Sequence, residues 1–181
     1  NSDIMMGRER RFGYTLIEVL VVASITSLLA GMLILQNSVG QRQITMSVEI
    51  AKLSQIVLKA KAYAVATYND PGRPCGFGIH VDYSANKYSL RSYRTQLDCV
   101  NVTGIASSAV LQEFLPAAGL VLDASGANKI DDVIFIPPDP KPHILSGGAF
   151  LSDGSGKIYL KSSDGAIIRS VSVSLAGQVT F

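Results

Sequence analysis

One carboxylate stands inside the most apolar stretch of the chain. Glu18 is the only charged residue between positions 14 and 35, and no ionisable group follows it from Val19 to Leu35. A carboxylate within a membrane costs about 2.5 to 3.5 kcal/mol, so a glutamate in such a run needs a partner and is a candidate functional residue. The alternative is that Glu18 lies at the level of the lipid headgroups and reaches water there.

Two cysteines are the next residues that could do chemistry. Cys75 and Cys99 lie far beyond the apolar run. In an oxidising compartment they would pair, close a loop of about 25 residues and stabilise the fold by about 3 to 4 kcal/mol. Two separate thiols are the alternative, because a sequence contains no geometry.

The remaining polar residues give no pattern of an active site. His80 and His143 are the only histidines, and neither has a cysteine or carboxylate at a spacing that suggests zinc. Asp123, Asp131 and Asp132 are spaced too irregularly for a calcium loop. The glycine pairs are short and lack a phosphate-loop pattern. The sequence therefore predicts no enzymatic activity, no metal and no cofactor.

The composition indicates one domain with an apolar appendage. The chain has 181 residues, of which 48% are hydrophobic and 17% are charged, against about 25% charged in a typical soluble domain. The net charge of +2 does not point to a polyanion as partner. As a helix, residues 14–35 would span about 33 Å and match a hydrocarbon core of about 30 Å. We predict a transmembrane helix there.

The charges before this run predict its orientation. Arg8, Arg10 and Arg11 outnumber Glu9, which keeps the N-terminus in the cytoplasm and exports the rest, with a single pass through the inner membrane. An ordinary secretory signal is the alternative, but its apolar centre should have about 7 to 15 residues and no carboxylate.

The border between the charged segment and the apolar run carries a specific motif. Residues 13–20 read GYTLIEVL, so one glycine separates the charged segment from an aromatic residue and the apolar run. This pattern resembles the class III signal of the type IV pilin and type II pseudopilin superfamily. Tyr14 replaces the usual phenylalanine. A start at Met5 or Met6 would make residues 1–4 upstream sequence.

The resemblance implies a maturation pathway. A prepilin peptidase in the membrane would cleave between Gly13 and Tyr14, which removes residues 1–13 as a leader, and Tyr14 would then be N-methylated. Glu18 would meet the new N-terminus of a neighbouring subunit, which neutralises both charges in the filament. The implied partners are the peptidase, other pilins or pseudopilins, the inner-membrane assembly platform and, before assembly, membrane lipid.

The helix is predicted to continue over residues 36–68 as an amphipathic segment. No proline occurs before Pro71, and apolar residues recur there at alternating spacings of 4 and 3. This stripe consists of Met46, Ile50, Leu53, Val57, Ala60 and Ala64. Polar residues lie mostly off it, namely Gln43, Glu49, Lys52, Lys59 and Lys61. We expect the stripe to pack on the protein's own sheet, and a coiled-coil partner is the alternative.

Residues 69–181 are predicted to form an exported β-rich domain. A hairpin is expected from residues 78–83 and 87–93, because Ser84, Ala85 and Asn86 between them favour a turn. Further strands are predicted at residues 109–115, 133–136, 157–160, 167–174 and 178–181. Residues 137–142 contain four prolines and are expected to form an extended loop.

The last third of the chain resembles a narrower group. The segments 135–137, 154–160, 168–174 and 177–179 look like the C-terminal half of the GspH/FimT branch of minor pseudopilins and minor pilins. The two resemblances imply an α+β fold in which a long N-terminal helix packs on an antiparallel sheet or sandwich, the pilin lollipop. They also imply a structural subunit of a type II secretion pseudopilus or a type IV pilus.

A DNA-binding minor pilin for natural transformation is the alternative function. Such proteins hold DNA through basic residues near the C-terminus, by phosphate contacts that do not read sequence. Lys157, Lys161 and Arg169 are the basic residues nearby, against Asp153 and Asp164. This balance makes DNA a weaker candidate partner.

Overall fold

The structure is a computed structural model that describes residues 14–66, 74–95, 105–138 and 141–181. The side chains of residues 33–39, 95 and 105–107 are outside this description. The chain divides into two units, Asn1–Gln41 and Arg42–Phe181, and each is described by itself.

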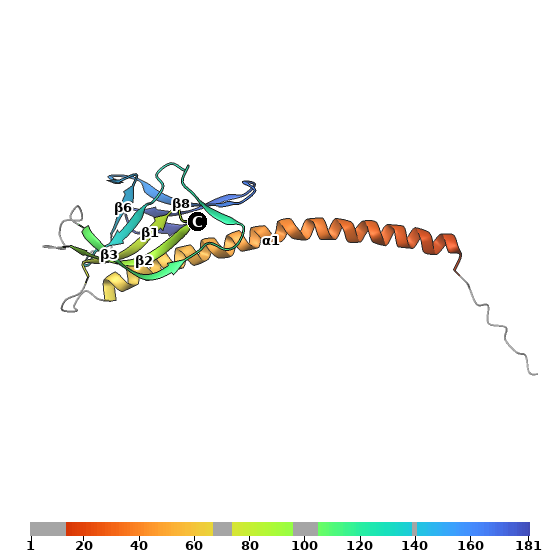
Figure 1. The fold of residues 1–181 in the computed structure, drawn as a ribbon, viewed down its shortest axis with the longest axis horizontal. Coiled ribbons are helices and arrows are strands. Elements are labelled where there is room, and N and C mark those ends of the chain that lie inside the picture. The colour runs from red at the N-terminus through yellow and green to blue at the C-terminus, as the bar shows by residue number, and fades with distance from the viewer. Residues whose placement is uncertain (1–13, 67–73, 96–104, 139–140) are drawn as a thin grey trace, which may run out of the picture. The chain divides into compact units, whose positions relative to one another are not determined.

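One long helix and ten strands make up the described residues. Helix α1 runs from Leu16 to Ala66, and Figure 1 shows its C-terminal part in orange and yellow beside the sheets. The strands are β1 (Gly76–Asp82), β2 (Lys87–Thr95), β3 (Ile105–Phe114), β4 (Leu120–Asp123), β5 (Asp132–Phe135), β6 (Pro142–Ser146), β7 (Ala149–Phe150), β8 (Ser155–Ser162), β9 (Ile168–Ser174) and β10 (Val179–Thr180).

The strands form two antiparallel sheets. Sheet A has six strands in the order β3-β2-β1-β5-β6-β7, and sheet B has four in the order β10-β9-β8-β4. The predicted hairpin is β1–β2, in which Asp82 lies opposite Lys87. Its turn contains Asn86 at a φ of +49°, a conformation that asparagine tolerates better than most residues. The α+β fold with an N-terminal helix on antiparallel sheets is therefore confirmed.

The core of the second unit lies between α1 and both sheets. All six residues of the predicted helical stripe are buried and belong to one apolar cluster. Sheet A contributes Ile79, Leu90 and Phe135 to this cluster, and sheet B contributes Leu160 and Val173. The stripe thus packs on the protein's own domain, as expected, because these side chains recur on one face of the helix.

The side chain of Glu49 is charged and nevertheless buried. It lies off the buried stripe, yet it is only 4% exposed. The Tyr88 hydroxyl donates to Glu49 Oε1 over 2.8 Å, and Lys52 Nζ lies 3.3 Å from the same oxygen. Burial of this carboxylate is tolerated because it keeps a hydrogen bond and an opposite charge.

Three strands were not expected from the sequence. Two of them are short, β4 with four residues and β7 with two. β6 begins at Pro142, inside the segment predicted to be an extended loop. A proline is compatible with the first residue of a strand, which is the position that Pro142 occupies.

Two glycines allow close contact between neighbouring strands of sheet A. A Cβ atom on Gly78 would collide with the carbonyl oxygen of Val133 on β5. One on Gly76 would lie 2.6 Å from the oxygen of Phe135. Only glycine fits at these two positions of β1, because any larger residue would force the strands apart.

Candidate functional site

The candidate site is the start of α1, where a reciprocal set of hydrogen bonds holds Glu18. Glu18 Oε2 accepts from the backbone nitrogen of Thr15 over 3.2 Å and from its hydroxyl over 3.3 Å. The Thr15 hydroxyl oxygen in turn accepts from the backbone nitrogen of Glu18 over 3.3 Å. This is a capping box, in which Thr15 caps the helix and Glu18 is the third helical residue.

The capping box sets where the helix begins. Val19 donates its backbone N–H to the oxygen of Thr15 over 3.3 Å, which is the first helical hydrogen bond. Tyr14 precedes the cap and has no helical structure. Gly13 lies outside the described residues, so the predicted cleavage between Gly13 and Tyr14 stays a prediction.

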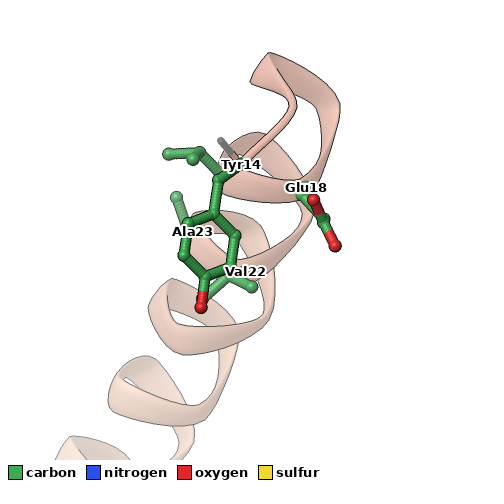
Figure 2. A pocket seen from close by; sticks show the side chains of 5 residues that line it. Tyr14, Glu18, Val22 and Ala23 are labelled. Atoms are coloured by element: carbon green, nitrogen blue, oxygen red, sulfur yellow. The ribbon is translucent and has the colours of Figure 1, made fainter. Parts of the chain in front are cut away.

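The side chains around the capping box form an exposed, mostly apolar surface. Tyr14 is 84% exposed and Leu16 is 83% exposed. Figure 2 shows the Tyr14 ring lying along the helix beside Val22 and Ala23, while the carboxylate of Glu18 points away from that ring. These residues line an open hollow together with Val19. Among the lining residues, Glu18 is the one with a charged side chain.

In the next helical turns, two hydroxyl side chains donate hydrogen bonds to the backbone of their own helix. The Ser24 hydroxyl donates to the backbone oxygen of Val21 over 2.8 Å, and the Thr26 hydroxyl donates to that of Val22 over 2.9 Å. In a medium without water such bonds avoid the cost of an unpaired hydroxyl. Among the residues that the structure describes, no helix combines the length and apolarity that a membrane crossing requires.

The structure describes one of the two cysteines of the predicted disulfide. Cys75 is 8% exposed and is not a free thiol. Its backbone nitrogen donates to the oxygen of Tyr93 over 2.8 Å, which ties it to β2. Cys99 lies outside the described residues, so the pairing of these two cysteines stays a prediction.

One histidine and one aspartate, His80 and Asp132, are neighbours within sheet A. Asp132 Oδ1 lies 3.0 Å from His80 Nδ1 and accepts from the Tyr93 hydroxyl over 2.7 Å. Burial, followed by the nearby charge of Asp132, raises the pKa of Tyr93 well above its usual value. The sequence missed this group because His80 and Asp132 are 52 positions apart and meet only through the β1–β5 pairing.

The other candidate polar residues have local roles. The ring of His143 packs edge-on against Phe150, with the centroids 6.4 Å apart. Asp131 Oδ2 accepts from the backbone of Gly147 over 2.6 Å. Asp123 accepts from Ser125 in a turn. In the described part of the chain, no three histidine, cysteine or acidic side chains come together in a way that could hold a metal.

The basic residues near the C-terminus are divided between surfaces. Lys157 and Lys161 alternate with the buried residues of β8 and so face outward on either side of Tyr159. Arg169 is also exposed, but it lies opposite Leu160 and so is on the other face of sheet B. Asp164 pairs with Arg42 and does not neutralise these lysines. Two lysines on one face can neutralise only a few phosphates of a polyanion.

A comparison with known protein families finds a known motif near the start of the chain. Residues 8–34 match the family model described as the prokaryotic N-terminal methylation motif. This match includes the capping box and the expected cleavage position, and it does not extend to the C-terminal half on which the narrower resemblance depends. Neither a curated protein nor a solved structure matches this chain.

Proposed function

Because the chain carries the N-terminal methylation motif, the signature of type IV pilins and pseudopilins, we propose that it is a minor pilin or pseudopilin. It is a structural subunit of a secretion pseudopilus or a pilus. The observation that carries the proposal is Glu18, a carboxylate in an otherwise uncharged helix start within the matched motif.

Maturation follows from where the helix begins. The capping box starts α1 at Leu16, so the backbone of Tyr14 lies outside the helix. A peptidase binds its substrate in an extended form, and a glycine before the bond lets it approach the backbone closely. Prepilin peptidase therefore cleaves between Gly13 and Tyr14, and Tyr14 receives the methyl group.

Assembly uses the oxygen of Glu18 that the capping box does not occupy. Both bonds from Thr15 end on Oε2, and Oε1 has no hydrogen-bond partner within the described part of the chain. Cleavage frees a cationic amine on Tyr14. The amine of a neighbouring subunit pairs with Glu18 through Oε1, and this pairing offsets the cost of placing both charges in an apolar filament centre.

Before assembly the chain is a membrane-anchored precursor. The uncharged run that supports this continues to Leu35, of which the side chains are described as far as Met32. The arginines that precede the run keep the N-terminus in the cytoplasm, and the domain of sheets A and B is exported. The partners are the prepilin peptidase, other pilins or pseudopilins and the inner-membrane assembly platform.

The test is the N-terminus of the mature protein. Mass spectrometry of protein from its native host should find a methylated Tyr14 as the first residue. Gly13→Val should leave the leader attached, because a branched side chain blocks the close approach. Gly7→Val, a glycine change within the leader, is the matched control and should be processed normally. Mature protein that keeps its arginine-bearing leader would contradict the proposal.

A further inference from the structure

The second half of α1 has an apolar face that its own domain leaves open. Ile44 is 66% exposed, Val48 is 61%, Leu58 is 50% and Val65 is 54%. With the residues between them they form a row at alternating spacings of four and three, which we name the outer stripe: Ile44, Val48, Ala51, Gln55, Leu58, Ala62 and Val65.

The outer stripe lies opposite the buried stripe. Each of its first six residues is followed two positions later by a buried residue, as Val48 is by Ile50 and Leu58 is by Ala60. Two positions rotate a helix by about 200°. The domain therefore covers one face of this helix and presents the opposite apolar face to solvent, which is the pattern of a surface that packs on another helix.

Three basic residues flank the outer stripe. Lys52 follows Ala51, Lys59 follows Leu58, and Lys61 precedes Ala62. These positions flank a helix–helix contact and set partner choice. The one acidic residue of residues 42–66 is Glu49, which is 4% exposed and accepts from Tyr88.

The flanking lysines contact their own domain, and Lys59 on one side and Lys61 on the other make both rims of the stripe positive, whereas Lys52 is paired with Glu49. Lys59 Nζ donates to Gln112 on β3 over 3.1 Å, and Lys61 Nζ donates to the oxygen of Gly177 over 3.3 Å. Lys52 Nζ lies 5.7 Å from the ring of Phe114. A second copy of this chain would bring three more lysines and no exposed acid from the same helix, which disfavours self-pairing.

We propose that the outer stripe docks an amphipathic helix of a different subunit, with acidic residues on both sides of its apolar contact row. This inference rests on the proposed function and adds the chemistry of the partner. Burial of the apolar row supplies the affinity. The opposite charges on the rims select this partner over a second copy.

The test uses the full chain in lipid nanodiscs and two fluorescent helical peptides. The peptides share one row of leucine and valine over three heptads and differ only at the flanking positions, which are glutamate in one and lysine in the other. By fluorescence anisotropy the glutamate peptide should bind at least about tenfold more tightly than the lysine peptide. Equal affinity, no binding, or equal binding to empty nanodiscs overturns the proposal.

Two variants and one control locate the contact. Leu58→Gln should weaken binding of the glutamate peptide at least about tenfold. Lys59→Glu should shift the preference toward the lysine peptide. Ile168→Gln removes a similarly exposed apolar residue on β9 and should leave binding unchanged. If Leu58→Gln instead dissolves a self-association seen without peptide, a second copy occupies the stripe and the proposal is wrong.

A separate measurement, of whether the leader is removed, distinguishes a failure of this inference from a failure of the proposed function. Leu58→Gln should still be cleaved after Gly13, because the stripe lies far along the helix from the motif. A chain that matures normally but shows no charge preference overturns the inference alone. A chain that never loses its leader overturns the proposed function.

Discussion

At the scale of single residues, Glu18 has two roles that share one carboxylate. It caps its own helix through Oε2 and is proposed to pair with a neighbour's amine through Oε1. The charged form suits both, since an anion near a helix N-terminus is favourable. The sequence identified this residue because a single carboxylate in an uncharged run is conspicuous. It did not indicate that Thr15 already holds one of the two oxygens.

Glu18→Ala should therefore separate processing from assembly. We expect the leader to be removed, because the Gly13–Tyr14 bond is unchanged, and incorporation beside other pilins to fail, because the neighbour's amine loses its partner. Immunoblotting of sheared filaments and of membranes measures the two steps. Glu113→Ala removes an exposed carboxylate on β3 and is the control. Normal incorporation of the Glu18 variant would refute the pairing.

Two buried tyrosines and a partly buried one make the domain of sheets A and B sensitive to alkaline pH. Tyr83 donates to the oxygen of Ile130, Tyr88 to Glu49 and Tyr93 to Asp132. In each case burial is the largest cause that raises the pKa of the phenol. The unfolded chain then loses these protons at lower pH than the folded chain does, so stability is present below about pH 10 and is lost as the pH rises above it.

The thermal midpoint should accordingly fall above about pH 10. Circular dichroism of the full chain in nanodiscs, from pH 8 to pH 11, measures it. Tyr88→Phe should flatten this fall and lower stability at pH 8 by about 1 to 3 kcal/mol, because Glu49 loses a donor. Tyr14→Phe changes an 84% exposed ring and is the control. A midpoint that does not change across this range would contradict the assignment.

At the scale of elements, long periodic segments were predictable, whereas the three short strands β4, β6 and β7 were not. The buried stripe of α1 follows the helical period, and the β1–β2 hairpin follows from alternation around Asn86. β6 was missed because its first residue, Pro142, belongs to the segment that was expected to form a loop. The outer stripe was missed because the lysines beside it suggested a wet face.

The contact between β1 and β5 should not tolerate a side chain at Gly78. Gly78→Ala should destabilise the domain by about 1 to 3 kcal/mol, because the added methyl meets the backbone of Val133. The thermal midpoint by circular dichroism measures this. Gly40→Ala is the matched control, since nothing lies within 4 Å of a Cβ there, and it should keep or slightly raise stability. An unchanged midpoint for Gly78→Ala would show that the strands can separate at little cost.

At the scale of the whole molecule, export would oxidise the only two cysteines. Intact mass of the mature protein should be about 2 Da below that of the reduced protein, because a disulfide lacks two hydrogens. Cys75→Ser should abolish the difference and lower the thermal midpoint, since the unfolded chain is then less constrained. A mature protein with two alkylatable thiols under non-reducing conditions would disprove the pairing.

The surface charge of the domain of sheets A and B is expected to give little affinity for DNA. Lys157 and Lys161 share the outer face of β8, whereas Arg169 has the other register. We expect no electrophoretic shift of duplex DNA by the full chain in nanodiscs at physiological salt, because few phosphates could be neutralised together. A shift that disappears with added salt and with Lys157→Ala would restore DNA capture as the function.

The sequence alone identified the motif near the start of the chain, because the glycine, the arginines, Glu18 and the uncharged run are neighbours along the chain. It also determined that a helix precedes a β-rich domain, since periodicity is local. Only the tertiary structure decided that Glu49 is buried, that His80 meets Asp132 and that a second apolar face of α1 stays open. These features depend on which faces of distant segments cover one another, and spacing along a chain does not specify that.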